Sequence, residues 1–218
     1  MRDGSWRAQM GLGIFLLIFG LLLGAFPVRA EVVINEIMAD PASDWNGDGE
    51  IDTKLDEWVE VHNTGPDGVF LTHYWLRDSL DDTPHLNMFG YLDAGETAVF
   101  YGHHAVAWQL ENGAGSSGLS LNNGGDTVVL LHTNEDDPDQ LDVVDSHAYV
   151  SHTAEDDRST GRHQEGEVWL LFDGLDIYDG TNEPLSTGCE PSPGAPNACP
   201  GGTPAEATSW SAVKGRFE

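Results

Sequence analysis

Positively charged side chains are scarce in this sequence. Its 218 residues include 9 Lys and Arg against 37 Asp and Glu, which gives a net charge of −28 at pH 7. Proteins bind DNA largely by neutralising phosphates with Lys and Arg, and so few scattered cations cannot form the basic face that this requires. The same charge repels anionic lipid. We therefore expect no nucleic-acid partner, and we expect cations to be the ligands that this protein attracts.

Cysteine is also scarce, since Cys189 and Cys199 are the only two in the chain. In an exported protein, two cysteines this close together in a Pro- and Gly-rich loop are predicted to pair as a disulfide. The alternatives, a metal pair or reactive thiols, lack nearby partners. So short a ring would contribute about 2–3 kcal/mol at most, so the bond would staple the end of the domain without making the fold.

Long hydrophobic runs are absent beyond one near the start, Met10–Phe26. This run follows two arginines and precedes Val28-Arg29-Ala30, a pattern typical of a secretory signal peptide with its cleavage site. We predict that residues 1–30 are removed and that the mature protein begins at Glu31 with a net charge of about −30. The alternative is an uncleaved membrane anchor. The cleaved protein would be secreted or attached to the cell surface, without contact to the membrane.

What the sequence does contain is a series of short apolar runs separated by turn residues, without sustained helical periodicity. This pattern indicates an all-β fold. The only stretch with helical character is His103–Leu110. Strands are expected at Val32–Met38, Trp58–Asn63, Phe70–Leu76, Thr97–Tyr101, Leu119–Leu121, Thr127–His132, Val143–Tyr149 and Val168–Phe172.

Two of these strands identify the expected core. Val59 and Val61 share one face of their strand, because side chains alternate along an extended chain. In the run Val128–Leu131 every residue is apolar, as expected for a central strand that is covered on both sides.

The composition also predicts how the chain is divided. Residues 31–199 are expected to form one domain, which is large enough to bury a core of its own. Residues 200–207 are predicted to be a linker, and residues 208–218 a short amphipathic tail. The apolar residues of this tail recur at helical spacing: Trp210, Val213 and Phe217.

Several segments, taken in their order and spacing, resemble the lamin tail domain family in its secreted bacterial form. They are Val33–Ile37, Asp40-Pro41, Asp56–Asn63, Leu71, Tyr74–Asp78, Leu92–Thr97, Leu121–Thr127, Val143–Ser146 and Pro191–Asn197. The resemblance implies an immunoglobulin-like β-sandwich that serves as an accessory or surface domain outside the cell. It brings no catalytic residues, so we expect that the protein is not an enzyme.

The resemblance further implies that two short polar motifs, Asn35-Glu36 and Glu60 with Asn63, hold strand ends and turns by hydrogen bonds. Eukaryotic relatives contact chromatin, a role that does not transfer to so acidic and exported a chain. Two parts go beyond the family pattern. They are an Asp-rich insert between the first two strands and the cysteine loop after Thr187.

The Asp-rich insert, which we call the acidic loop (residues 44–57), is similar to a calcium loop of the EF-hand or dockerin type. Acid or amide oxygens stand at positions 1, 3 and 5, glycine at 6, an aliphatic residue at 8 and an acid at 9. Position 12 departs from the pattern, because Leu55 stands where a bidentate acid is expected. The predicted ligands of one Ca²⁺ are Asp44, Asn46, Asp48, the Glu50 carbonyl and Asp52, with Asp56 or Glu57 completing the set. The alternative is a solvated acidic turn.

Other chemistry has weaker support. Nine histidines occur, but none shows the His-Glu-x-x-His spacing of a zinc site. His147 and His152 lie near Asp145 and Asp156, which allows an adventitious site; the alternative is a set of scattered surface imidazoles. No Gly-x-Ser-x-Gly nucleophile motif is present. Three functions stay open: a structural module of the cell surface or extracellular space, a carbohydrate- or protein-binding module, and a small calcium-dependent hydrolase.

Overall fold

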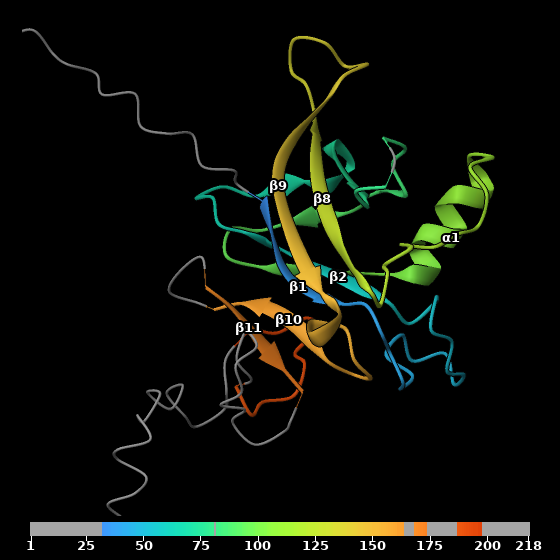
Figure 1. Cartoon of the computed structure of the whole chain (residues 1–218). Helices are drawn as coiled ribbons and strands as arrows, with labels where there is room; N and C mark the ends of the chain where they lie inside the picture. Colours follow the sequence, from blue (N-terminus) through green and yellow to red (C-terminus); the bar gives the residue numbers. More distant parts are fainter. Residues whose placement is uncertain (1–31, 81, 164–167, 174–186, 198–218) are drawn as a thin grey trace, which may run out of the picture.

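A computed structural model describes residues 32–80, 82–163, 168–173 and 187–197 (Figure 1). The predicted signal peptide, linker and C-terminal tail lie outside these residues, as does Cys199. The fold is an all-β, immunoglobulin-like sandwich with one short helix.

The first sheet has five antiparallel strands in the order β11-β10-β1-β2-β7. Their bounds are β1 Val32–Met38, β2 Trp58–Asn63, β7 Thr97–Tyr101, β10 Ser159–Arg162 and β11 Trp169–Phe172. The pairing of β1 with β2 is interrupted by a bulge between Ile34 and Glu36. Strands from the two ends of the described chain therefore lie side by side in this sheet.

The second sheet has the order β5-β4-β8-β9, and a two-stranded ribbon pairs β3 with β6. The bounds are β3 Val69–Phe70, β4 Tyr74–Arg77, β5 Leu86–Asn87, β6 Tyr91–Leu92, β8 Gly125–Thr133 and β9 Leu141–Val150. The β8–β9 hairpin projects beyond the rest of the sandwich, and helix α1, Gly102–Glu111, lies to one side (Figure 1).

The core lies between the two sheets. Val59 and Val61 of β2 are fully buried, which confirms their prediction as core residues. Strand β8 is covered on both faces as predicted, because none of the four side chains in Val128–Leu131 is more than 6% exposed. The position of this strand between β4 and β9 gives it neighbours on both edges as well.

The outer face of the first sheet is also covered. Trp58 and Glu60, which alternate with Val59 and Val61 along β2, are 0% exposed. The indole of Trp45 in the acidic loop packs on Trp58 with ring centroids 6.2 Å apart. Residues 187–197, which we call the closing segment, bond to side chains of β1 and β2. Two segments remote in sequence thus form a third layer.

The predicted elements match the observed ones unevenly. The predicted ranges Val32–Met38, Trp58–Asn63 and Thr97–Tyr101 are the bounds of β1, β2 and β7, and the helix at His103–Leu110 is confirmed by α1. Phe70–Leu76 was wrong as one strand, because a 3-10 turn at Leu71–His73 separates β3 from β4. Leu119–Leu121 was wrong because these residues form a loop, in which Ser120 has a φ of +60°.

Candidate functional site

The acidic loop is tied to the sandwich at its start by Asp157, which lies between β9 and β10. Its carboxylate accepts hydrogen bonds from the backbone N–H groups of Ala42 and Ser43 and from Trp45 Nε1, at 2.8, 3.0 and 2.7 Å. These donors hold the pKa of Asp157 below its usual value, although burial acts in the opposite direction. The strained φ of +51° at Asp157 places this carboxylate.

Within the loop, acid and amide side chains cap backbone N–H groups. Asp44 Oδ1 accepts from Gly47 and Asp48, and Asp44 Oδ2 accepts from Gly49 at 2.9 Å. The same kind of bond runs from Asp48 N to Asn46 and from Lys54 N to Asp52; Gly47 and Gly49 turn the chain with positive φ. This is Asx-turn chemistry, in which short polar side chains replace backbone partners.

Asp56 and Glu57 end the loop in different surroundings. Asp56 is 0% exposed and accepts from Asn46 N at 2.9 Å and from Asp52 N at 2.8 Å, so it faces the loop. Glu57 instead accepts from Leu121 N at 3.4 Å, and burial raises its pKa to about 9. Of the two candidates for the last calcium ligand, only Asp56 bonds to the loop.

The end of the loop packs on helix α1. The N–H groups of Gly102 and His103 donate to Glu57 O at 2.7 Å and Leu55 O at 3.2 Å, which satisfies two free donors at the helix start. A Cβ atom at Gly102 would lie 1.8 Å from Lys54 O. Only glycine therefore allows the loop and the helix to approach this closely.

The structure does not gather the predicted metal ligands around one point. Among the described residues, no three His, Cys, Asp or Glu side chains form a cluster that could hold a metal ion. His147, a candidate for a zinc site, belongs to no such cluster either. Its ring stacks on Trp169 with ring centroids 3.4 Å apart. Burial, followed by the charge of Arg162, lowers the pKa of His147 to about 4.

A polar network joins the closing segment to the first sheet. Glu36 accepts from Ser159 Oγ and Ser192 Oγ, and Glu60 accepts from Asn35 Nδ2 and from Gly194 N at 2.6 Å. Asn197 Nδ2 donates to the carbonyl oxygens of Asn35 and Arg162. At the other end of β2, Asn63 Nδ2 bonds to the carbonyl oxygens of Asp67 and Leu92.

These bonds confirm Asn35, Glu36, Glu60 and Asn63 as residues that hold the fold. The sequence did not identify Ser192 and Asn197 as their partners, although both lie in the motif Pro191–Asn197. It also missed the ion pair between Asp145 and Arg162, whose atoms Oδ2 and Nη2 are 2.8 Å apart. Asp145 Oδ2 additionally accepts from Ile34 N, so this carboxylate links the two sheets at the bulges of β1 and β9.

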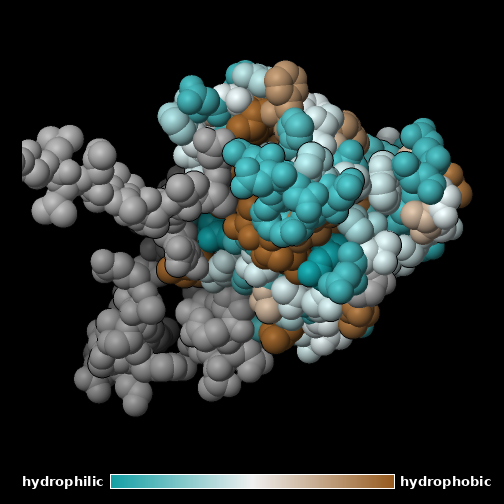
Figure 2. Space-filling model, turned by 90° about the horizontal axis from the view of Figure 1, so that it is seen from above, coloured by the Kyte–Doolittle hydropathy of each residue, from teal (hydrophilic) through white to brown (hydrophobic). Residues whose placement is uncertain are grey.

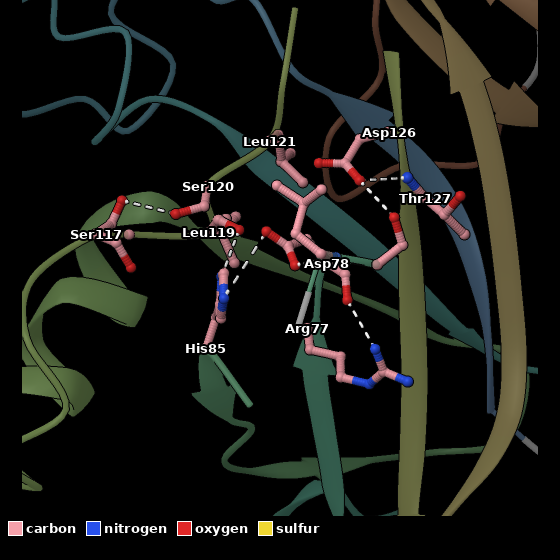
Figure 3. Close-up of polar contacts among 12 residues, drawn as sticks. Arg77, Asp78, His85, Ser117, Leu119, Ser120, Leu121, Asp126 and Thr127 are labelled. Carbon is pink, nitrogen blue, oxygen red and sulfur yellow. Dashed lines mark hydrogen bonds and ion pairs between the residues drawn. The ribbon is translucent and has the colours of Figure 1, made fainter. Parts of the chain in front are cut away.

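One group of residues has the side chains of a catalytic triad without its geometry (Figure 3). His85 Nδ1 donates to Leu119 O at 2.9 Å, and its Nε2 is 3.9 Å from Asp78 Oδ2. Ser120 donates instead to Ser117 O. Because both ring nitrogens face other partners, His85 has no nitrogen left to activate the Ser120 hydroxyl.

The surface is mainly hydrophilic where it is seen from the tip of the β8–β9 hairpin, with a few separate hydrophobic areas (Figure 2). An aromatic pair is exposed on the β3–β6 ribbon. Phe70 and Tyr91 are 62% and 53% exposed, and their ring centroids are 4.9 Å apart. The Tyr91 hydroxyl lies against Gly68, where a Cβ atom would approach it to 2.1 Å.

Fold and polar network together define an immunoglobulin-like module. The model of the Lamin Tail Domain family matches residues 27–151, which is more than half of the chain. The chain therefore belongs to the lamin tail domain family. A search of curated proteins finds no match. The family match ends at Ser151, whereas β10 and β11 complete the five-stranded sheet and the closing segment covers its outer face.

Among the described residues, no helix is long and apolar enough to cross a membrane.

Proposed function

We propose that this lamin tail domain is an exported structural or binding module of the cell surface or extracellular space, stabilised by calcium and without catalytic activity. The observation that carries the proposal is the attachment of the acidic loop to the sandwich. Asp157 holds its start, Asp56 holds its end, and Trp45 packs on the buried Trp58. Ordering the loop therefore stabilises the outer layer of the first sheet.

The oxygen atoms of the loop have the chemistry that calcium prefers. The candidate ligands are the side chains of Asp44, Asn46, Asp48, Asp52 and Asp56 together with the Glu50 carbonyl. The described hydrogen bonds of Asp48 and Asp52 use Oδ1, which leaves Oδ2 of each for a cation. Hard Ca²⁺ takes six to eight such oxygens and tolerates irregular geometry.

Because these oxygens are not gathered around one point, calcium would have to draw the loop together as it binds. Ordering costs free energy, so the affinity is expected in the weak range of extracellular modules, with a Kd of about 10⁻⁴ to 10⁻³ M. The weak range suits an exported protein, because calcium outside cells is present at comparable concentrations. Calcium would hold the loop and screen the repulsion among its acids.

Isothermal titration calorimetry of the mature protein tests calcium binding. We expect one site in the wild type and its loss in Asp48→Ala, which removes a central ligand. Asp137→Ala, in the equally acidic tip of the β8–β9 hairpin, is the matched control and should bind as the wild type does. Binding that is unchanged in Asp48→Ala would place the ion elsewhere.

Export is tested separately by intact-mass measurement of the protein recovered from culture medium. The mass of a chain that begins at Glu31 supports the proposal. The mass of a chain that still contains Met10–Phe26 would mean that the module is anchored in the membrane.

A second candidate function, recognition of a carbohydrate or protein ligand, is favoured by the exposed aromatic pair Phe70 and Tyr91. Exposed aromatic rings are enriched at binding surfaces because they offer large apolar area with little loss of side-chain entropy. A glycan and peptide screen with wild-type protein and the double variant Phe70→Ala, Tyr91→Ala tests it. A ligand retained equally by both proteins would exclude this pair as the binding surface.

A further inference from the structure

Two buried glutamates face each other beneath the closing segment. Glu36 of β1 is the direct cross-strand partner of Glu60 of β2, and both are 0% exposed. Among the described residues, no Lys, Arg or His forms an ion pair with either carboxylate. Two like charges directly opposite in a sheet destabilise it, and burial without a counter-ion increases the cost.

The closing segment is attached to both carboxylates. Ser192 donates from its backbone N–H to Glu36 Oε1 at 3.3 Å and from its hydroxyl to Glu36 Oε2 at 3.1 Å. Gly194 N donates to Glu60 Oε2 at 2.6 Å. The protonation of this pair and the position of the segment are therefore linked.

The groups around the pair do not neutralise it. Arg162 of β10 is close, but its guanidinium is engaged by Asp145 at 2.8 Å. Tyr101 of β7 is a titratable side chain on the far side of β2; burial raises its pKa, and the negative charges of Glu60 and Asp56 act in the same direction. In the closing segment itself, Glu190 is exposed.

Burial accordingly raises the pKa of Glu36 and raises that of Glu60 to about 7, with the charge of Glu36 acting in the same direction.

We propose that Glu36 and Glu60 share one proton and form a pH-dependent latch for residues 187–197. The segment is held on the first sheet while the pair carries the proton, and it is released when both carboxylates ionise. In the released state water reaches the carboxylates, so they bind the proton less tightly. Rising pH therefore favours release, and falling pH favours attachment. This latch does not depend on calcium.

Amide hydrogen exchange followed by NMR tests the latch, with rates corrected for their intrinsic pH dependence. The amides of Ser192 and Gly194 should lose protection above neutral pH by up to about tenfold per pH unit, as expected when release is coupled to loss of one proton. The amides of β8, far from the latch, should keep theirs. Constant protection of Ser192 and Gly194 between pH 6 and 9 would overturn the proposal.

Glu36→Gln is the decisive variant because its network can be kept. The amide oxygen can accept from Ser192 N, while the amide nitrogen can donate to the Ser192 hydroxyl, which then donates to Asn197 Oδ1, now 3.3 Å away. With one carboxylate left the repulsion is gone and only burial still raises the pKa of Glu60, so Ser192 and Gly194 should lose less protection with rising pH than in the wild type. Glu57→Gln changes a buried carboxyl outside the latch, so in this variant the protection of the Ser192 and Gly194 amides should depend on pH as it does in the wild type.

A pH dependence in Glu36→Gln equal to that of the wild type would contradict the latch. If this variant does not fold, ¹³C titration of the glutamate side chains in the wild type gives the answer. If both carboxyl groups titrate as ordinary exposed glutamates, the proposal that they share one proton is wrong.

Discussion

Asn63 at the end of β2 shows how a single polar side chain can hold this fold. Its Nδ2 donates to Asp67 O at 2.8 Å and Leu92 O at 3.1 Å, and its Oδ1 accepts from Gly65 N at 3.0 Å. The side chain is fully buried. Three backbone groups, two in the loop after β2 and one in β6, therefore depend on one amide.

We predict that Asn63→Ala lowers the free energy of unfolding by about 1–3 kcal/mol for each buried group left without a partner. Urea denaturation measures the change. The half-buried Asn134 at the β8–β9 turn makes comparable local bonds at the surface, and Asn134→Ala should cost less than about 0.5 kcal/mol. Equal effects of the two variants would mean that the Asn63 network contributes little.

Single residues of the core and of the polar motifs could be predicted from the sequence, and their partners could not. Val59 and Val61 were identified by alternation along β2, which is a local property. Burial of Trp58 and Glu60 on the opposite face depends on Trp45, in the loop that folds back over β2, and on the closing segment, which approaches from a remote part of the chain. Alternation says which side chains share a face, but it does not say what covers that face.

The elements of the sandwich were predicted best where strands are long and central. Strands β1, β2 and β7 were found because their apolar patterns are continuous, whereas β3, β5 and β6 have two residues each and leave no detectable period. Strand β10, Ser159–Arg162, was missed because it lacks large apolar side chains. Its place beside β1 is held by pairing and by the Asp145–Arg162 ion pair.

Asp145 gives a test of this link between the sheets. In Asp145→Ala, Arg162 loses its ion pair and the part-buried Ile34 N–H loses its acceptor. We expect a loss of about 2–4 kcal/mol in the free energy of unfolding, since a charged group and an amide are both left unpaired. Asp142→Ala, on the exposed part of β9, is the control. Thermal stability within about 1 °C of the wild type in Asp145→Ala would show that the two sheets do not need this carboxylate.

The contact between the acidic loop and helix α1 gives a test at Gly102. Replacing Gly by Ala in a helix normally stabilises it by about 0.5–1 kcal/mol. Here the new Cβ atom would meet Lys54 O, so Gly102→Ala is expected to destabilise the protein by about 1–3 kcal/mol. Chemical denaturation gives the sign directly. A stabilised Gly102→Ala variant would show that the loop moves aside at no cost.

For the whole molecule, buried acids predict an unusual dependence of stability on pH. Burial raises the pKa of Glu57 to about 9 and that of Glu60 to about 7. A carboxyl whose folded-state pKa lies above its unfolded value near 4.5 contributes stability that is fully present below that value and is lost as the pH rises through the folded pKa. His104 and His147, with pKa values lowered to about 4, act in the opposite direction below pH 6.5.

We therefore predict that the melting temperature falls between about pH 7.5 and 9, where histidines of the unfolded state are nearly all neutral and the buried glutamates still lose protons. Glu57→Gln should flatten the upper part of this decline, because the amide carries no proton to lose. Differential scanning calorimetry at constant ionic strength measures both proteins. A melting temperature that rises over this interval would contradict the assignment of buried, proton-bearing glutamates.

The central claim, that calcium stabilises the module through the acidic loop, is tested most directly by its melting temperature in calcium and in chelator. At calcium ten times above Kd, binding contributes about 1.4 kcal/mol, which corresponds to a rise of about 3–5 °C for a domain of this size. We predict this rise for the wild type and its absence in Asp48→Ala. The same melting temperature for the wild type in millimolar calcium and in chelator would contradict the claim and leave the loop as an acidic turn.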